Sequence, residues 1–509
     1  MTDLDPSKIF RKTIIIPIVI YLLLILINFT AILIVNDFKF TYTIDDPYIH
    51  LSLAENISNC HYGINKDEYS SPASSIIYPV LLLPLVKTEF GYLLPLVINI
   101  FSSIGIIYFF WKLLTLVFAN SKLKKNQIQL VIILFLISII IAGNLVYSTF
   151  RGMEHTLQAL MSIIILWSTA EFINKNRIPR IFYISVVIAP LVRYENLSIS
   201  LAILLFLFIY RNKKVAWSAI IIIILLAGFS YFLLSLGLEP LPLSVLRKSK
   251  VLENDLFSNI LTQGGLALII TLILLINYFR IKSNPSKEKL LSVFFAAVIL
   301  VHMVLGVSGR YTEYLITSSL FILIFLYKDW IIKALETYYN KYIALFVIIP
   351  LLISYKQVIS IFVVPFAANN IFEQQYQMHR FVVDYYKKPV AVNDIGYVSF
   401  RNDNYVLDIF GLSSLESYRH WNSAKNISWM DSLAEKHNVN LIMIYEHWFK
   451  EIPSNWIKVG ELHLGNKQMT VSGSVVSFFI RDSDHLDQIH SLLSDFQKTI
   501  PEKTKLILF

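Results

Sequence analysis

Two adjacent carboxylates, Asp45 and Asp46, have the residue type and spacing best suited to chemistry in this sequence. They follow shortly after an apolar run that ends near residue 35, and charges beside a bilayer are costly unless they are hydrated or paired. A carboxylate here can take the proton from an attacking hydroxyl group, and its oxygens can bind a divalent cation. A structural interpretation competes with these roles, because an aspartate before Pro47 is a common start of a helix.

Three further charged residues, Glu154, Arg193 and Glu195, occur where apolar runs end. Glu154 can contact a ligand and, with Asp45, offers the carboxylate oxygens that a divalent cation such as Mg²⁺ or Mn²⁺ prefers. Alternatively, it is an acid in the first turn of a helix, where the helix dipole favours it. Arg193 and Glu195 bind a substrate phosphate or hydroxyl group, or they form a structural ion pair with each other.

Cations gather in two places that suit phosphate binding. Arg247 and Lys248 lie in the loop 237–259, and a guanidinium group pairs well with a phosphate. The same loop also suits unspecific contact with the anionic headgroups of membrane lipids. Arg310 and Tyr311 form the second candidate or, alternatively, a plain interfacial anchor.

The elements that must position these residues are membrane helices. Hydrophobic residues make up 56% of the 509 residues and charged residues 16%, whereas a soluble domain is roughly 45–50% apolar and about 25% charged. Apolar runs of about 20 residues recur, and each can cross a hydrocarbon core of about 30 Å. The sequence predicts an all-α polytopic membrane protein with about eleven transmembrane helices, at residues 13–35, 91–118, 128–147, 156–173, 181–193, 196–210, 215–236, 260–280, 289–307, 311–327 and 342–364.

Lys and Arg residues concentrate in alternate loops between these spans. The positive-inside rule places those loops, and with them the N-terminus, in the cytoplasm. Residues 72–86 read either as one more span or as a re-entrant or interfacial helix. Three prolines in this short segment favour the second interpretation, and an extra span would put every later basic loop on the wrong side. Residues 36–90 then form one long first outer loop.

The character of the sequence changes near residue 365. β-type runs between polar turns, and one segment with helical spacing, predict a small α/β domain over residues 365–509. Residues 1–364 form the transmembrane domain. An N-terminus inside and an odd number of spans make the C-terminal domain extracytoplasmic.

The placement of the cations, the cysteine count and the motifs of the sequence exclude several other classes of function. The net charge of +9 does not indicate nucleic-acid binding, because the cations lie in short loops between apolar runs. Cys60 is the only cysteine, so a disulfide within the chain and a cysteine-rich metal site are both impossible. The sequence has no glycine-rich nucleotide-binding motif.

In their order along the chain, these motifs resemble those of the GT-C class of polyprenyl-phosphate-sugar glycosyltransferases, in particular the mycobacterial terminal arabinofuranosyltransferases and their bacterial relatives. That family has an aspartate pair with a nearby aromatic residue after the first span, followed by a set of short motifs. The matching segments are Asp45-Asp46-Pro47-Tyr48, Tyr69-Ser70-Ser71-Pro72, Gly152-Met153-Glu154, Arg193-Tyr194-Glu195-Asn196, Leu241-Pro242-Leu243-Ser244 with Lys248, Arg310-Tyr311, Asp394-Ile395-Gly396 and Asp408-Ile409-Phe410-Gly411-Leu412. Tyr194, Asn196 and Leu243 depart from the family, which has proline, glycine and asparagine there.

The resemblance implies an inverting glycosyltransferase. It moves a sugar from a polyprenyl-phosphate carrier to a cell-envelope glycan or lipid acceptor on the outer face of the bacterial cytoplasmic (inner) membrane. Asp46, or else Asp45, acts as the general base, and Glu154 binds the sugar, the acceptor or a metal ion. The carrier phosphate is held by Arg247, Lys248 and Arg310. Some members use a divalent cation and others do not, so the resemblance leaves metal dependence open.

A membrane transporter or flippase of lipid-linked sugars is the alternative. Such a protein needs charged or broken helices near the bilayer midplane, often in two matching halves. The sequence shows no such symmetry, and its acids cluster at span ends. This distribution favours chemistry at the membrane surface.

Overall fold

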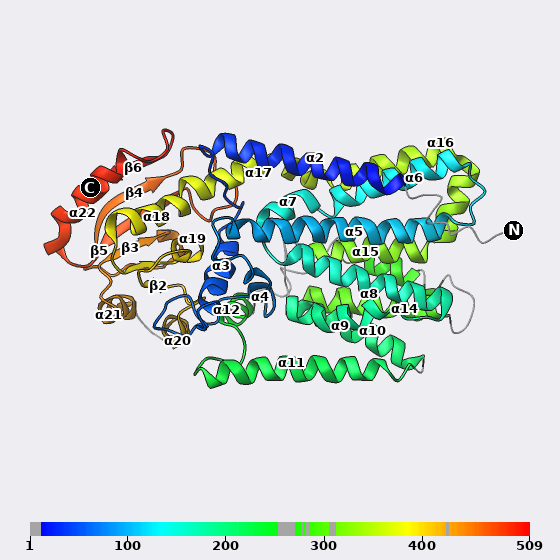
Figure 1. Ribbon diagram of the computed structural model, residues 1–509, viewed down its shortest axis with the longest axis horizontal. Coiled ribbons are helices and arrows are strands. Elements are labelled where there is room, and N and C mark those ends of the chain that lie inside the picture. The colour runs from blue at the N-terminus through cyan, green and yellow to red at the C-terminus, as the bar shows by residue number, and fades with distance from the viewer. Residues whose placement is uncertain are drawn as a thin grey trace.

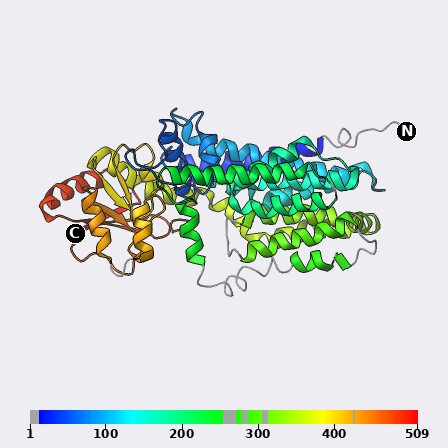
Figure 2. The ribbon, with the colours of Figure 1, turned by 90° about the horizontal axis from the view of Figure 1, so that it is seen from below.

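A bundle of apolar helices and a smaller α/β unit lie end to end along the longest axis of the protein (Figure 1). The structure is a computed structural model that describes residues 12–509 except 211, 253–269, 277, 280–285, 305–311 and 424–426. The start of the first described helix lies at the end of the bundle that is remote from the sheet (Figure 1). Figure 2 shows the same end-to-end arrangement from a direction turned by 90°.

The bundle consists of helices whose outward faces are apolar. On α11, for example, Trp217, Ile223 and Tyr231 are 65–74% exposed, as expected for side chains whose solvent is lipid. The described helices of the bundle are α2 (Lys12–Val35), α5 (Leu94–Phe118), α6 (Lys125–Ala142), α7 (Leu145–Arg151), α8 (His155–Lys175), α9 (Arg180–Val192), α10 (Leu197–Ile209), α11 (Val215–Ser235), α14 (Lys287–Val304), α15 (Glu313–Leu326), α16 (Lys328–Ile353) and α17 (Tyr355–Glu373).

Within the described residues, five helices are long and apolar enough to cross a membrane: 12–35, 91–118, 125–151, 155–175 and 215–235. A sixth results if α15 and the first part of α16, bent by 69°, count as one span. The eleven predicted spans are therefore not confirmed. Helices α9 and α10 have 13 residues each, about 20 Å of helix against a core of about 30 Å. Most of the predicted span 260–280 lies outside the described residues.

The segment between α2 and α5 contains only short helices, α3 (Asp46–Ile57), α4 (Tyr78–Leu82) and a 3₁₀ turn at Gly91–Leu93. Residues 72–86 therefore do not form a spanning helix, because the five residues of α4 cover less than about 10 Å. Helix α3 connects the two parts of the protein. Its Tyr48 packs in the core of the bundle, and the next residue, Ile49, packs in the core of the α/β unit.

The α/β unit is built on a six-stranded sheet with strand order β2-β1-β3-β5-β4-β6. Strand β1 pairs in parallel with β2 and β3, and the remaining pairs are antiparallel. The strands are β1 (Val390–Val392), β2 (Val406–Asp408), β3 (Leu441–Ile444), β4 (Ile457–His463), β5 (Val475–Ile480) and β6 (Lys505–Leu508). Its helical elements are α18 (Gln375–Arg380), a π-helical turn at Phe381–Tyr386, α19 (Gly396–Ser399), α20 (Leu415–Ser423), α21 (Ser428–Lys436), 3₁₀ turns at Glu446–Trp448 and Ser483–His485, and α22 (Leu486–Gln497).

Two short elements complete the region where the bundle meets the sheet. Helix α12 (Leu243–Leu252) contacts α20, and α19 contacts α3. Figure 1 shows α3, α4, α12 and α19 together at this end of the bundle. We refer to it as the sheet-side end.

Candidate functional site

Asp45 joins α3 to the start of α19. Its side chain does not cap α3, although α3 begins at Asp46 with a proline in its first turn, as predicted. Instead, the two carboxylate oxygens accept hydrogen bonds from the backbone N–H groups of Gly396, at 2.6 Å, and Tyr397, at 2.7 Å. These N–H groups are unsatisfied donors at a helix start. The Asp-Pro and Asp-x-Gly motifs, which are about 350 residues apart, are therefore two halves of one contact.

Gly396 is required by this contact for steric reasons. A Cβ atom at residue 396 would lie 2.5 Å from the Cγ atom of Asp45, and closer still to its carbonyl and carboxylate oxygens. Ordinary carbon–carbon contacts are about 3.5–4.0 Å. Only glycine allows the backbone at this position to approach the carboxylate so closely.

A second carboxyl group, Asp394, hydrogen-bonds to Asp45. Burial and then the charge of Asp394 raise the pKa of Asp45 well above its usual range, while burial raises the pKa of Asp394 to about 6. The pair therefore favours holding a proton between two carboxyl groups. Gln375 donates to Asp394 at 3.1 Å and to the hydroxyl oxygen of Tyr445 at 2.8 Å, which fixes the pair against the α/β unit.

Asp46 occupies the first position of α3 and is partly exposed, whereas Asp45 is 5% exposed. Its charge contributes to the raised pKa of Asp394, after burial. Asp46 is thus the member of the predicted pair that a ligand can reach, while Asp45 is occupied by backbone donors.

The predicted residues Glu154, Arg193 and Glu195 form one buried charge cluster. The guanidinium group of Arg193 donates to Glu154 Oε1 at 2.5 Å and to both carboxylate oxygens of Glu195, at 2.7 and 3.2 Å. Ser74 donates to Glu154 at 2.7 Å, and the His50 ring lies 3.3 Å from the second oxygen. Burial opposes ionisation of Glu154, but Arg193 and His50 outweigh it and hold the pKa of this carboxyl well below its usual range.

This cluster corresponds to the structural interpretation of Arg193 and Glu195, extended by Glu154. Arg193 is 4% exposed and turns three of its nitrogen atoms toward carboxylates. The structure thus gives Arg193 carboxylate partners, and its binding of a substrate phosphate or hydroxyl group stays a prediction. The cluster lies where the segment 36–90, the start of α8 and the start of α10 meet, so it fixes this segment to the bundle.

Gly152, two residues before Glu154, holds the loop in a second way. Its φ is +69°, and a Cβ atom there would lie 2.6 Å from the ring of Tyr42 and 2.9 Å from Cγ of Pro47. The hydroxyl group of Tyr78 donates to the Gly152 carbonyl at 2.9 Å. The Gly-Met-Glu motif therefore packs directly against the start of α3, which carries the aspartate pair.

Arg247 on α12 is held by the motif that begins at Asp408. The guanidinium carbon lies 4.7 Å from the ring centres of both Phe410 and Trp421. Asp408 accepts backbone hydrogen bonds from residues 410–413 at 2.6–3.0 Å, and Gly411 takes a φ of +87° within this turn. The Asp408 carboxylate folds the loop so that Phe410 faces Arg247.

The predicted motifs around residues 69–72 and 241–244 also meet. The backbone N–H of Leu243 donates to the Ser71 carbonyl at 3.0 Å and to the Ser71 hydroxyl at 3.3 Å. Ser71 and Ser244 are both buried. This contact places α12, with Arg247, beside the segment 36–90.

Three predicted residues cannot be placed in this site. Lys248 lies in α12, but its side chain is outside the described residues, as are Arg310 and Tyr311 entirely. Close to them in sequence, Glu313 accepts from Ser148 at 2.5 Å and pairs with Arg151. Neither member of that ion pair was selected from the sequence.

The predicted metal ligands Asp45 and Glu154 are each occupied by protein donors, as described above. In the described part of the chain, no group of three or more His, Cys, Asp or Glu side chains could hold a metal ion. Two carboxylates that are already bound by protein donors do not fit a divalent cation.

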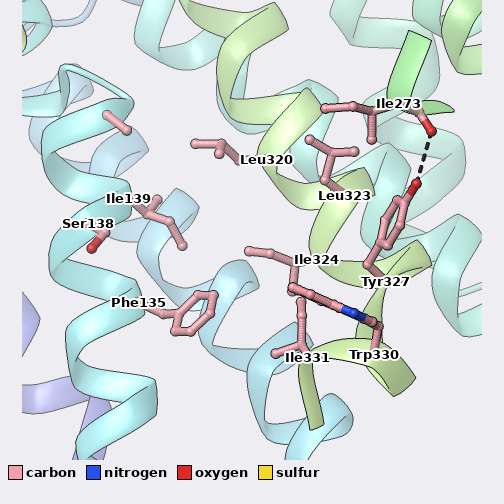
Figure 3. A pocket seen from close by; sticks show the side chains of 11 residues that line it. Phe135, Ser138, Ile139, Ile273, Leu320, Leu323, Ile324, Tyr327, Trp330 and Ile331 are labelled. Carbon is pink, nitrogen blue, oxygen red and sulfur yellow. Dashed lines mark hydrogen bonds between the residues drawn. The ribbon is translucent and has the colours of Figure 1, made fainter. Parts of the chain in front are cut away.

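A separate apolar cavity lies between α6, α15 and α16, with a volume of about 300 Å³. Figure 3 shows Phe135, Leu323 and Trp330 around it, and the Tyr327 hydroxyl donating to the Ile273 carbonyl at 3.0 Å. None of the residues that carry the predicted chemistry lines it. It offers a place for a hydrocarbon chain but no group for a reaction.

A family described as "Domain of unknown function (DUF8728)" matches residues 369–479, the first part of the α/β unit with the end of α17. No curated protein matches the sequence. Among solved structures, the Archaeoglobus fulgidus oligosaccharyltransferase, crystallised in complex with Zn and sulfate, is similar with a TM-score of 0.41 and 13% identity, over 83% of this chain and 67% of that chain.

Proposed function

We propose that the protein is an inverting glycosyltransferase of the GT-C type that uses a polyprenyl-phosphate sugar. The observation that supports this proposal is the pairwise contact of motifs that are far apart in sequence. Asp45 contacts Gly396, Ser71 contacts Leu243, and Arg247 contacts Phe410. A chain that merely contained chance matches to these motifs would have no reason to bring them into contact in pairs.

In the proposed reaction, Asp46 is the general base. Its carboxylate takes the proton of the acceptor hydroxyl while the hydroxyl oxygen forms a bond to the anomeric carbon of the donor. The bond between that carbon and the carrier phosphate breaks, and the phosphate leaves with the electron pair. Attack from the side opposite the leaving group inverts the configuration at the anomeric carbon.

Arg247 is the proposed contact for the leaving phosphate. A guanidinium group is always charged and matches phosphate geometry. Its two flanking aromatic rings fix the plane of the guanidinium group, and the charge of the nearby Asp408 carboxylate acts on it. Lys248, Arg310 and Tyr311 remain predicted phosphate contacts on the basis of sequence.

The buried charges support the site but do not react in it. Asp45 orients the start of α3, and with it the following residue, Asp46. Glu154, Arg193 and Glu195 hold the loop against the bundle, and direct sugar or acceptor binding by them remains a prediction. In this proposal the partly exposed carboxylate of Asp46 reacts, and the buried carboxylates of Asp45 and Glu154 hold the surrounding elements in position.

We further propose that the sheet-side end faces outward from a bacterial cytoplasmic membrane, with the N-terminus in the cytoplasm and about eleven spans. The distribution of Lys and Arg residues supports this orientation. The α/β unit would then be extracytoplasmic, and the acceptor would be a cell-envelope glycan or lipid.

The test is transfer by the purified full chain in nanodiscs from a panel of polyprenyl-phosphate sugars. The variant Asp46→Asn is expected to lower kcat by about 10²-fold or more, within the range of one lost general base. The control is Asp37→Asn at an exposed position with a φ of 50°, where asparagine is well tolerated.

Equal rates for wild type and Asp46→Asn would exclude the assignment of the base. Movement of an intact lipid-linked sugar across the bilayer without transfer, unaffected by Asp46→Asn, would favour the flippase alternative.

A further inference from the structure

A polar cavity of about 160 Å³ lies at the C-terminal end of α3. Its walls come from the end of α3, the loop that follows it, and the segment Ser399–Tyr405 of the α/β unit. Of the fourteen described residues that line it, Ile64 is the only aliphatic one and five are asparagines. A cavity between two parts of a protein that exposes mainly amides, hydroxyls and carboxylates is suited to a ligand rich in hydrogen-bonding groups.

The walls of this cavity are held in place by paired hydrogen bonds. The Asn65 side chain donates to the Val406 carbonyl at 3.0 Å and accepts from the Val406 N–H at 2.8 Å. The Asn56 amide donates to the carbonyls of Gly63 and Ile64, at 2.8 and 2.7 Å. The cavity is therefore pre-formed, which reduces the entropy that a ligand must lose on binding.

The charges that line the cavity nearly cancel. Glu55, Asp67 and Asp403 face two cations, Lys66 and Arg401. The Lys66 amine pairs with Asp403 at 2.7 Å, and the Arg401 guanidinium donates to backbone carbonyls, including that of Thr88 at 2.5 Å. Phosphate would find no surplus cation here. The described residues contain no group of ligands for a metal ion. The amides and hydroxyls of the lining favour a ligand that binds through hydrogen bonds.

The position of the cavity relates it to the proposed base. Glu55 lies nine residues after Asp46 on α3, so the two ends of the helix are about 14 Å apart. The short helix α19 packs beside α3, because its start binds Asp45 and its last residue, Ser399, lines the cavity and hydrogen-bonds to Ser52 at 3.2 Å. A chain of a few linked sugar rings is long enough to bridge this distance, with one hydroxyl at Asp46 and an inner ring in the cavity.

We propose that this cavity is a subsite for one neutral sugar ring of the acceptor glycan, away from the ring that is extended. The volume supports a single ring, since sites for drug-sized ligands are about 300–1,000 Å³. This inference rests on the proposed transferase function, and it identifies the acceptor as an oligosaccharide chain with uncharged units.

The single cysteine, Cys60, gives a direct test. It is exposed and follows Asn59, which lines the cavity. We would attach a benzophenone maleimide to Cys60 in the full chain, irradiate envelope membranes of the native host, and analyse the purified adduct by mass spectrometry. The expected adduct carries whole sugar residues and is sensitive to periodate. Asn404→Trp, which fills the cavity, should reduce it at least fivefold.

Two controls keep this result separate from the proposed chemistry. Asp46→Asn should give the same adduct as wild type, because binding in the cavity does not need turnover. A protein with Cys60→Ser and Lys498→Cys places the reagent directly after α22, where Lys498 is 70% exposed, and should give no carbohydrate. Adducts that contain only lipid or protein, or equal carbohydrate at both positions, would overturn the subsite.

Discussion

Gly396→Ala is the sharpest test of the contact between α3 and α19. The added methyl group would lie 2.5 Å or less from atoms of Asp45, so the two backbones must separate by about 1 Å to reach an ordinary contact. The hydrogen bonds of Asp45, now 2.6 and 2.7 Å, would then exceed the usual limit of about 3.2 Å.

The expected loss follows from those two bonds. Each hydrogen bond to a charged group contributes about 1.5–3 kcal/mol, and we take the lower value because Asp45 shares its proton with Asp394. The free energy of unfolding should therefore fall by about 3 kcal/mol. With about 2–4 °C of Tm per kcal/mol, the Tm of the α/β unit should fall by about 6–12 °C.

Tryptophan fluorescence of the full chain in detergent measures this transition. The matched control is Gly228→Ala on α11, where an added Cβ atom has no neighbour within 4 Å. That change should be neutral or slightly stabilising, since alanine favours a helix by about 1 kcal/mol over glycine. A double-mutant cycle with Asp45→Ala should be strongly non-additive, because both changes remove the same bonds. A Tm of Gly396→Ala within the error of the Gly228→Ala value would refute the reasoning.

Three further predictions concern the buried carboxylates. Glu154→Gln should lower the free energy of unfolding by about 3 kcal/mol, at the lower end for breaking a buried ion pair. Glu171→Gln breaks a pair on α8 whose lysine, Lys175, is 57% exposed, and it should change the free energy of unfolding by less than about 0.5 kcal/mol. Equal Tm shifts for the two variants would contradict this prediction. The Asp394 pKa rises from 3.8 to about 6 on folding, so this carboxyl favours the folded state below pH 3.8 and loses that contribution as the pH rises through about 6. The Tm of wild type should fall over this range relative to Asp394→Asn, and parallel pH profiles would count against it. Asp408→Asn should raise the KM for the donor about tenfold, which corresponds to about 1.4 kcal/mol, and leave kcat nearly unchanged. The reason is that the loop that stacks on Arg247 loosens. A fall in kcat without a change in KM would indicate a different role for Asp408.

The sequence predicted which residues form the sheet-side end but not how they pair. Asp46 and Glu154 are identifiable because charges near the ends of apolar runs are costly in a membrane, and Arg247 because cations gather in the loop 237–259. Asp394 received no role from the residues alone. Nothing in local spacing indicates that a carboxyl group will lie beside another one about 350 residues away. Gly396 is the one local indication, because a glycine there permits the close approach of another backbone. The sequence does not say that this backbone is that of Asp45.

The number of spans was the weakest part of the sequence prediction. Hydropathy gives apolar runs but not their direction, so α15 and α16 look like an ordinary span and loop until the bend of 69° is seen. Prolines at residues 72–86 were a better guide, because a lost donor and a steric clash act locally. The position of short helices such as α9 depends on packing against neighbouring helices. The hydrophobic periodicity of a single sequence does not reveal this packing.

The bond between Asp45 and Gly396 also has a consequence for biosynthesis. The aspartates leave the ribosome early, whereas their partner is made about 350 residues later, after every described helix of the bundle. Until that stretch has been synthesised and has reached the same side of the membrane, α3 lacks the donors that fix its first turn. A nascent or truncated chain would therefore carry the reactive carboxylate in an unorganised loop. The proposed transfer activity would then appear only after the C-terminal part has been synthesised and delivered.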